Sequence, residues 1–186
     1  MIELTSTDKN LNIRHSIKEI DKNMQSIKVL VTGSAGFIGF HISKLLLSQG
    51  HQVHGYDGMT DYYNVKLKHK RHEILEEYKN FSCTLGMLEN NELMDHVFED
   101  FNPDIVIHLA AQAGVRYSLE NPRAYIDSNI IGTFNVLEAS RRLRVSHLLM
   151  ASTSSVYGAN QAMPFDENQK SDTQLTMYAA TKKATE

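Results

Sequence analysis

A glycine-rich junction between two apolar segments constrains the fold of this chain more than any other feature, and it reads TGSAGFIG at residues 32–39. The run before it, 27–31, is short and rich in β-branched residues, and the segment after it, 37–50, has apolar residues at helical spacing. Gly33 permits a tight turn, Gly36 lets backbone amides approach an anion, and Gly39 allows close packing of helix on strand. The junction therefore predicts a strand, a turn and a helix whose N-terminus can receive phosphate groups.

The rest of the chain continues this alternation of strands and helices. Strands are expected at residues 27–33, 51–57, 81–87, 104–111 and 146–152, and helices at 37–50, 65–79, 91–101, 124–143 and from 178 onward. Apolar strands that alternate with helices indicate a parallel sheet covered on both faces. The sequence thus predicts a doubly wound α/β domain of the Rossmann type over residues 27–186.

The first 26 residues are expected to form a separate N-terminal extension. Apolar residues recur there at roughly helical spacing in a polar segment, which favours an amphipathic helix: Leu11, Ile13, Ile17, Ile20 and Met24. No residue pattern in this extension points to chemistry.

Composition excludes several classes of function. A net charge of −3 gives no electrostatic reason to expect nucleic acid or an anionic membrane as partner. No apolar run approaches the roughly 20 residues that span a bilayer, and the N-terminus lacks the apolar core of a secretory signal. The single cysteine, Cys83, cannot form an internal disulfide and fits a reducing compartment. A soluble, cytoplasmic protein is expected.

An acidic residue at the end of the second strand suggests the ligand of the glycine junction. Asp57 follows Gly39 by 18 residues, where a carboxylate can accept hydrogen bonds from both hydroxyls of an adenosine ribose. The same carboxylate would repel a 2′-phosphate. The sequence therefore predicts a dinucleotide site for NAD in preference to NADP.

A hydroxyl cluster and a Tyr-Lys pair suggest a reaction centre. Tyr178 and Lys182 are four residues apart at the start of a predicted helix, so both side chains lie on one face. The Lys182 ammonium can stabilise a tyrosinate at Tyr178, which then serves as a general base. The hydroxyl run at residues 152–155 follows the fifth strand, at the edge of the sheet where open α/β proteins bind ligands.

Four segments together resemble the extended short-chain dehydrogenase/reductases, and specifically their nucleotide-sugar 4-epimerases: TGSAGFIG, HLAAQAGVRYS, SSVYG and YAATK. The resemblance covers residues 27–186, and HLAAQAGVRYS together with MTDYYNVKLK is most similar to UDP-glucuronate 4-epimerases. It implies a catalytic hydroxyl at Thr153, a base at Tyr178 and its partner at Lys182. It also places Ser154 and Ser155 beside the sugar.

The resemblance further implies a set of residues in contact with NAD: Gly33, Ala35, Gly36, Phe37, Ile38, Gly39, Asp57, Met87, Leu88, Leu109, Ala110, Ala111, Asn129, Tyr178 and Lys182. One position departs from the family pattern. Many relatives have Asp-Ile or Asp-Leu after the third strand to hold adenine, whereas this chain has Met87-Leu88. The resemblance therefore does not supply the contact to the adenine amino group.

The residues after Thr153 favour epimerisation over related reactions. Dehydratases of this family have Asp-Glu beside the catalytic hydroxyl, and UDP-glucuronate decarboxylases have Glu before Val-Tyr-Gly, whereas here Ser154-Ser155 follow. The implied reaction is transient oxidation at C4 of a UDP-sugar, such as UDP-glucuronate, for surface polysaccharide precursors. The alternatives are another sugar-nucleotide enzyme of the family (UDP-glucose 4-epimerase, dehydratase or decarboxylase) and a non-catalytic NAD-binding sensor or assembly protein.

Three other patterns in the sequence are compatible with binding. The basic run at 66–72 is followed at once by glutamates, which indicates a solvated helix face. The histidine pairs 51/54 and 69/72 have metal-ligand spacing, but no cysteine or carboxylate set completes a site, so no metal is expected. Arg116 can reach a substrate carboxylate or phosphate with its bidentate guanidinium, or form a structural ion pair.

The resemblance also implies that the C-terminal substrate domain is absent from these residues. The fragment is expected to bind NAD weakly and to show no turnover alone. The family pairs its subunits through two helices, which correspond here to residues 124–142 and 178–186, so a homodimer is expected.

Overall fold

A five-stranded parallel sheet forms the centre of the structure. The computed structural model describes residues 26–186, so the predicted extension lies outside the described residues, apart from Ser26. The strands are β1 (Lys28–Thr32), β2 (Gln52–Asp57), β3 (Phe81–Leu85), β4 (Ile105–His108) and β5 (His147–Met150), in the order β3-β2-β1-β4-β5. The predicted doubly wound α/β fold is confirmed.

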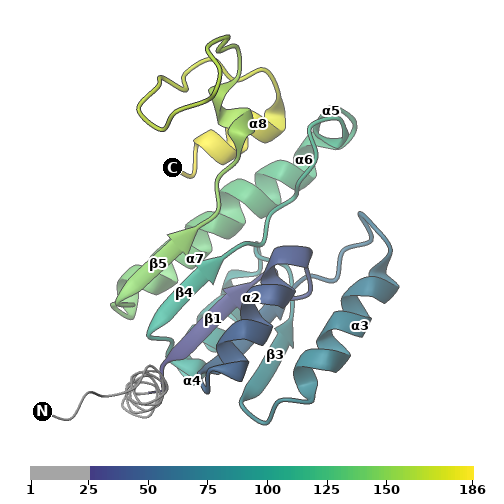
Figure 1. The fold of residues 1–186 in the computed structure, drawn as a ribbon, viewed down its shortest axis with the longest axis vertical. Coiled ribbons are helices and arrows are strands. Elements are labelled where there is room, and N and C mark those ends of the chain that lie inside the picture. Colours follow the sequence, from purple (N-terminus) through teal and green to yellow (C-terminus); the bar gives the residue numbers. More distant parts are fainter. Residues whose placement is uncertain (1–25) are drawn as a thin grey trace, which may run out of the picture.

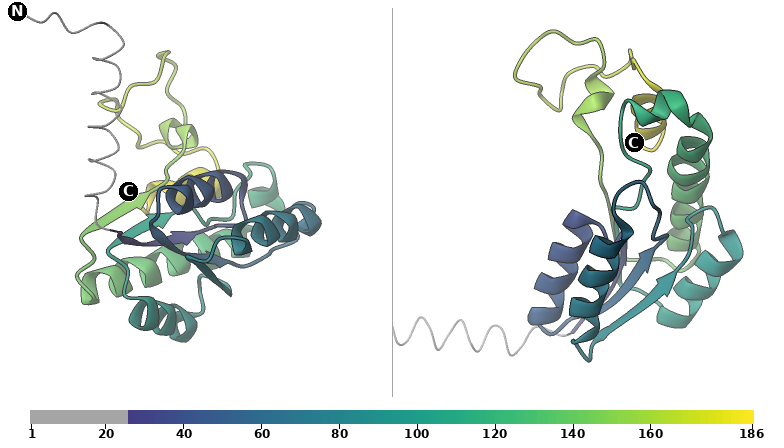
Figure 2. Two further views of the ribbon diagram at one scale, coloured as in Figure 1. Left: turned by 60° about the horizontal axis from the view of Figure 1, so that its bottom comes forward. Right: turned by 90° about the vertical axis from the view of Figure 1, so that its right-hand side faces the viewer.

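Helices cover both faces of the sheet (Figures 1 and 2). One face carries α2 (Phe37–Ser48) and α3 (Val65–Glu76), and the other carries α4 (Asn91–Phe101) and α7 (Gly132–Arg142). Short elements gather at the carboxyl end of the sheet: α5 (Tyr117–Glu120), α6 (Pro122–Tyr125), the 3₁₀ turn η2 (Ser154–Tyr157) and α8 (Met177–Lys183). Over residues 26–186, no helix combines the length and the apolarity needed to cross a membrane.

Alternation along the strands produces two apolar cores. Leu30 and Val106 face α4 and α7, while Val29 and Val31 face α2 and α3, and all four are at most 1% exposed. Burial of each such side chain stabilises the fold by about 1.5–3 kcal/mol. The central strands β1 (KVLVT) and β4 (IVIH) are mainly apolar, as expected for parallel strands that pack on both faces, whereas β2 (QVHGYD) and β3 (FSCTL) also contain polar residues.

The long helix predicted at 124–143 is divided in the structure. It comprises α6, the π-helical segment η1 (Ile126–Ile131) and α7. Asn129 lies inside η1, and its side chain bonds the backbone of Gln112 and the hydroxyl of Thr181. Gly132 follows, where an added Cβ would lie 2.3 Å from Cβ of Leu88, so only glycine permits this approach of the helix. Hydrophobic periodicity contains no signal for a local π turn.

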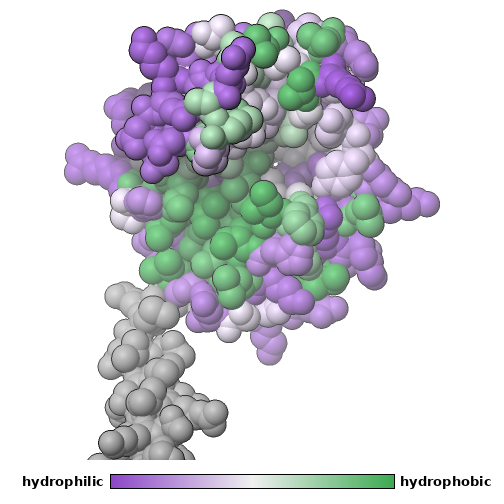
Figure 3. Space-filling model, turned by 45° about the horizontal axis from the view of Figure 1, so that its top comes forward, coloured by the Kyte–Doolittle hydropathy of each residue, from purple (hydrophilic) through white to green (hydrophobic). Residues whose placement is uncertain are grey.

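The sheet face beside α2 is open over β4 and β5. Figure 1 shows these strands with no helix in front of them, and Figure 3 shows hydrophobic surface on this side of the molecule. Leu149 on β5 is 46% exposed there, next to Ile107 of β4 in register. On α2, Phe37, Ile38 and Leu45 are also exposed.

A buried histidine joins β1 and β4 at their carboxyl ends. His108 is 3% exposed and lies between the hydroxyls of Thr32 (Nδ1 to Oγ1, 2.7 Å) and Thr133 (Nε2 to Oγ1, 3.1 Å). Because Thr32 Oγ1 accepts from the amides of Leu109 and Ala110, its proton is free to be donated to His108 Nδ1. Burial, together with the nearby Lys182 ammonium, lowers the pKa of His108 to about 3. The imidazole is therefore neutral at pH 7.

His108 should make the fold sensitive to mild acid. The unfolded histidine binds a proton below its ordinary pKa of 6.5, whereas the folded one stays neutral down to about pH 3. The contribution of neutral His108 to the free energy of unfolding is thus fully present above pH 6.5 and decreases as the pH falls. When the pH changes from 7 to 5, this residue should lower the free energy of unfolding by about 2 kcal/mol.

Urea denaturation at both pH values measures this loss. His108→Gln should remove most of it, whereas His69→Gln, a change at an exposed histidine of α3, should keep it. Equal acid sensitivity of the His108→Gln variant and the parent protein would contradict the assignment.

Candidate active site

A cavity of about 430 Å³ opens at the carboxyl ends of β1 to β4. It lies where the strand order reverses between β1 and β4, which is the position at which open α/β sheets bind ligands. Its walls come from the glycine junction, the ends of β2 and β3, and the segment after β4. They include Gly33, Gly36, Asp57, Lys68, Gly86, Met87, Leu88, Glu89, Leu109, Ala110 and Ala111.

The glycine junction forms the inner wall of the cavity. Gly33 has φ = +75°, and an added Cβ would lie 2.8 Å from the Ala110 amide nitrogen. Gly36 is the N-cap of α2 and has no side chain over the first turn of the helix. A Cβ on Gly39 would lie 2.1 Å from the Gly33 carbonyl oxygen. The backbone is therefore bare at the positive end of the α2 dipole, which suits a pyrophosphate.

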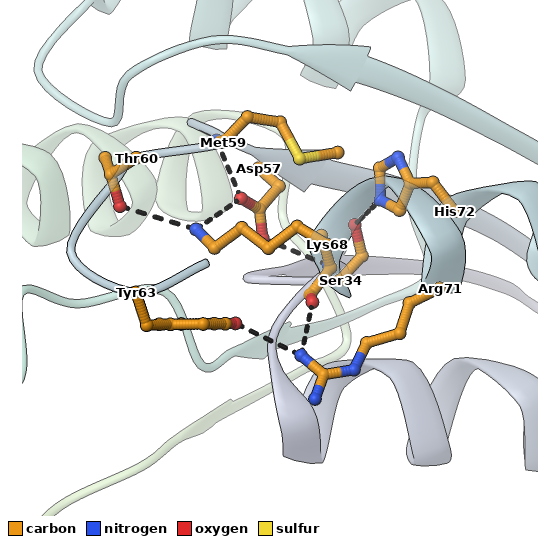
Figure 4. A network of polar contacts seen from close by, with 9 residues as sticks. Ser34, Asp57, Met59, Thr60, Tyr63, Lys68, Arg71 and His72 are labelled. Atoms are coloured by element: carbon orange, nitrogen blue, oxygen red, sulfur yellow. Dashed lines mark hydrogen bonds and ion pairs between the residues drawn. The ribbon is translucent and has the colours of Figure 1, made fainter. Parts of the chain in front are cut away.

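Asp57 is held in place from three directions (Figure 4). Its Oδ2 accepts from the amide of Ala35 (3.0 Å), and its Oδ1 accepts from the amide of Met59 (2.8 Å) and from Lys68 Nζ (3.2 Å). The side chains of Asp57 and Lys68 are only 5% and 8% exposed, and both residues line the cavity. The site predicted for the ribose thus carries a buried ion pair.

Lys68 is a site residue that the sequence interpretation missed. The buried positions of α3 are Lys68, His72 and Leu75, which recur at helical spacing on one face. A lysine on the buried face of a helix indicates a buried acidic partner, but the sequence alone does not show which face of α3 is buried. Thr60 also accepts from Lys68 Nζ (3.3 Å), which fixes the ammonium beside the cavity.

Arg71 and His72 fix the outer side of the glycine junction (Figure 4). Arg71 donates to the carbonyl of Ala35 (3.0 Å) and to the hydroxyl of Tyr63 (3.1 Å). His72 Nε2 lies 2.9 Å from the hydroxyl of Ser34, and burial lowers the pKa of this histidine. Helix α3 therefore helps to hold the loop in shape.

The structure brings the Tyr-Lys helix to the end of β5. Lys182 is 6% exposed, and its Nζ donates to the carbonyl of Ala151 (2.6 Å), just beyond the strand. Burial lowers the pKa of Lys182, and the nearby Glu186 partly offsets this. Tyr178, on the same helix, packs edge-to-face against Tyr125 with ring centroids 6.0 Å apart. Tyr178 and Lys182 thus both lie on helix α8, as predicted, and this helix packs at the carboxyl end of β5.

The predicted hydroxyl residues lie in the turn that α8 packs against. Thr153 is the N-cap of η2, where its Oγ1 accepts from the amide of Ser155 (3.2 Å). Thr153 and Ser154 line a second hollow of about 740 Å³, which also includes Lys183. The catalytic hydroxyl of the sequence interpretation is therefore at the same edge of the sheet as the cavity but outside its wall.

Asn129, predicted to contact NAD, has all its polar atoms engaged within the protein. Its Oδ1 accepts from the Gln112 amide (2.8 Å), and its Nδ2 donates to the Gln112 carbonyl (3.1 Å) and to Thr181 Oγ1 (3.1 Å). Gln112 follows the Leu109–Ala111 wall, and Thr181 lies on α8 beside Lys182. Asn129 thus joins the cavity wall to the Tyr-Lys helix.

Three further predicted ligand residues are exposed and are not part of the cavity wall. Phe37 and Ile38, on the first turn of α2, are 67% and 64% exposed and lie outside its wall. Arg116 is exposed at the start of α5, and it takes part in none of the ion pairs formed among residues 26–186. Their predicted contacts with cofactor or sugar stay predictions.

One group of metal-ligating side chains does come together, although none was expected from the sequence. Ligand atoms of His72, Glu76 and Cys83 lie within 4.8 Å of one another at the α3–β3 contact. The Cys83 thiol donates to Glu76 (3.9 Å), and burial, followed by the charge of Glu76, raises the pKa of the thiol. A protonated thiol is a poor metal ligand. The absence of a metal stays a prediction.

Fold and site together define a dinucleotide-binding α/β domain with a Tyr-Lys helix at the carboxyl edge of its sheet. The family model described as "GDP-mannose 4,6 dehydratase" matches residues 30–186. The chain therefore belongs to this family of extended short-chain dehydrogenase/reductases, as its motifs predicted.

Individual relatives are named for a different reaction from that of the family model. The chain is 52% identical over 160 residues to "Probable UDP-glucuronate 4-epimerase" of Rhizobium meliloti (strain 1021), covering 86% of the chain and 47% of that protein. It is 48% identical over 157 residues to UDP-glucuronate 4-epimerase of Thermodesulfobacterium geofontis (strain OPF15), covering 84% of the chain and 48% of that protein. The chain thus spans about half the length of these curated relatives.

A solved structure shares the fold. UDP-glucuronic acid 4-epimerase from Bacillus cereus, in complex with UDP-glucuronic acid and NAD, superposes with a TM-score of 0.78 at 32% identity. The match covers 86% of this chain and 50% of that one.

The Asp57–Lys68 pair should be necessary for stability. Lys68→Ala leaves the Asp57 carboxylate buried without its cation, and loss of one partner of a buried pair costs about 3–5 kcal/mol. The free energy of unfolding, from urea denaturation, should fall by this amount. Lys66→Ala, an exposed position on the same helix, is the matched control and should change it by less than about 0.5 kcal/mol. A similar effect of both variants would refute the buried pair.

Proposed function

We propose that the whole protein is an NAD-dependent UDP-sugar 4-epimerase, with UDP-glucuronate and UDP-galacturonate as its substrate pair. The observation that carries this proposal is the docking of the Tyr178–Lys182 helix, through the 2.6 Å bond from Lys182 to Ala151, at the sheet edge that holds the glycine-junction cavity. The names of the epimerases from R. meliloti, T. geofontis and B. cereus support the choice of reaction and sugar.

The residues present fit NAD. A dinucleotide needs bare backbone at its pyrophosphate, and side chains at Gly33 or Gly39 would collide with backbone atoms that form this cradle. Asp57 lines the cavity at the end of β2, where it can accept from the ribose hydroxyls. When bound, NAD supplies the hydride acceptor and donor for C4 of the sugar.

The remaining chemistry belongs to side chains of this chain. The Tyr178 oxygen takes the proton from the sugar 4-hydroxyl during oxidation and returns it during reduction. The Lys182 ammonium stabilises the tyrosinate, and its bond to Ala151 fixes its position. Thr153 supplies a hydroxyl to the same oxygen of the sugar, and Ser154 and Ser155 border the sugar.

The absence of a neighbouring acid separates epimerisation from dehydration. Loss of water from the sugar needs a proton donor beside the catalytic hydroxyl, and residues 154–155 are both serine. Exposed Arg116 is free to pair with the carboxylate of a uronic acid, because among residues 26–186 it has no ion-pair partner. Both features favour a UDP-uronate 4-epimerase.

The proposal includes an assembly and a location. Apolar side chains on η1 and α7 are exposed, with Phe134 at 60% and Ile131 at 39%, and a second subunit would cover them in a homodimer. Sedimentation velocity of the whole protein tests this assembly. A cytoplasmic enzyme that makes precursors of surface polysaccharides fits the single reduced cysteine.

A panel of UDP-sugars tests the activity. The whole protein should interconvert UDP-glucuronate and UDP-galacturonate, observed by NMR, and should form no 4-keto-6-deoxy product. Tyr178→Phe should lower kcat by roughly 10²- to 10⁴-fold, the usual effect of losing a general base, and should retain NAD binding. If the whole protein binds NAD and converts no UDP-sugar, the non-catalytic alternative holds.

Cofactor preference tests the assignment of Asp57. The carboxylate can accept from a ribose hydroxyl, whereas a 2′-phosphate offers it no donor, so NAD should bind at least about tenfold more tightly than NADP. Asp57→Asn should narrow this ratio because the amide can also donate to a phosphate. Calorimetric titration of both dinucleotides measures it, and equal affinities in the parent protein would argue against the assignment.

A further inference from the structure

Glu89 is a cavity residue whose carboxylate forms no ion pair within the described residues 26–186. It lies four residues beyond β3 and forms part of the cavity wall together with Met87 and Leu88. Its Oε2 is buried, and within residues 26–186 this atom has no hydrogen-bond partner. A buried carboxylate oxygen without a donor costs free energy, and a ligand that donates a hydrogen bond to it would recover that free energy.

Neighbouring donors are already used elsewhere. The Tyr56 hydroxyl is close enough for the Glu89 charge to help raise the pKa of Tyr56, after burial, to about 12. That hydroxyl donates to the Met87 carbonyl instead (2.9 Å). The Asn90 amide also donates to the Met87 carbonyl (3.1 Å), and the Gly86 amide donates to the carbonyl of Asp57 (3.1 Å). These neighbouring groups therefore donate to other acceptors, and none of them donates to Glu89 Oε2.

The order of groups along the cavity identifies which part of a dinucleotide reaches Glu89. Gly33 and Gly36 provide the pyrophosphate cradle, and Asp57 at the end of β2 is the ribose acceptor. The next wall is the end of β3, from Gly86 to Glu89. A base attached to that ribose must therefore lie against the β3 end, because the β4 wall lies on the opposite side of β1.

The base would meet one apolar and one acidic side chain. Met87 is 39% exposed, and its Sδ lies over Gly58, where it would be 2.7 Å from an added Cβ. Its polarisable thioether suits the flat face of a base. A carboxylate at the edge of the base selects a ring that presents an N–H donor, and the 6-amino group of adenine is such a donor.

We propose that Glu89 is the acceptor for the adenine amino group of NAD and replaces the acidic side chain that Met87 does not provide. The inference rests on the proposed binding of NAD. It assigns to Glu89 the discrimination of adenine from a base that carries a carbonyl oxygen at the same position. Met87 then contributes contact with the ring and no hydrogen bond.

NAD and nicotinamide hypoxanthine dinucleotide are the probes, because the hypoxanthine ring has a carbonyl oxygen in place of the amino group, and its N–H donor is at N1, one ring position away. The protein should bind NAD at least about tenfold more tightly, by calorimetry, since a hydrogen bond to a charged group is worth a factor of this size or more. In the Glu89→Gln variant the two dinucleotides should bind with affinities within about threefold of each other, because the glutamine amide can donate to the carbonyl oxygen of hypoxanthine. Glu89→Ala should weaken NAD binding about tenfold.

Two further variants separate a contact from a structural effect. Met87→Asp in the Glu89→Ala background places an acceptor at the other position and should restore the preference for NAD. Glu92→Gln, an exposed glutamate on the first turn of α4, should leave both affinities unchanged. Because no group among residues 26–186 donates to Oε2, Glu89→Gln should not lower the melting temperature of the protein without dinucleotide.

Two results overturn the inference. One is equal affinity of the parent protein for the two dinucleotides, and the other is an unchanged ratio in Glu89→Gln. In both cases NAD still binds, so the proposed cofactor survives. Failure of the parent protein to bind either dinucleotide overturns the proposed cofactor and the inference together.

Discussion

The close contact between Gly33, in the glycine junction after β1, and the backbone that follows β4 determines the rest of the site. Gly33 reaches Ala110 so closely that a single added carbon would lie 2.8 Å from the amide nitrogen, and Thr32 accepts from the same amide. This contact aligns the carboxyl ends of the two central strands. The cavity opens there, α2 begins there, and His108 is enclosed behind it. Any side chain at position 33 would prevent this contact and would crowd the cradle that the glycine junction forms.

Helices and strands that show a regular spacing of apolar residues were predictable from the sequence. The helix at 91–101 was predicted with the bounds that the structure has, because apolar positions recur every three to four residues between an asparagine cap and Asn102, which has a left-handed backbone. The Asp57 position was predictable too, since it depends only on where a strand ends. Lys182 was predicted as the partner of a tyrosine, and its bond to Ala151 depends on that helix register.

Features that depend on contacts distant in sequence could not be predicted in this way. The π segment around Asn129 exists because one side chain bonds residues 17 positions before and 52 positions after it. The partner of Asp57 is a lysine on the next helix, and a sequence pattern reports a buried lysine only when the buried stripe is already known. In the sequence Glu89 is an ordinary loop glutamate, and only the three-dimensional structure shows that its Oε2 is buried.

The Asp57–Lys68 pair also determines how the site responds to ionic strength. A buried carboxylate that already has its ammonium 3.2 Å away presents almost no net charge to an arriving molecule. The attraction that remains for an anionic dinucleotide comes mainly from the partial positive charge at the start of α2, and this attraction is short-ranged because it falls off within the first turn of the helix. Added salt screens exposed charges and affects buried, neutralised ones little. Capture of the adenosine half should thus be governed by shape and hydrogen bonding, with little dependence on the salt content of its surroundings.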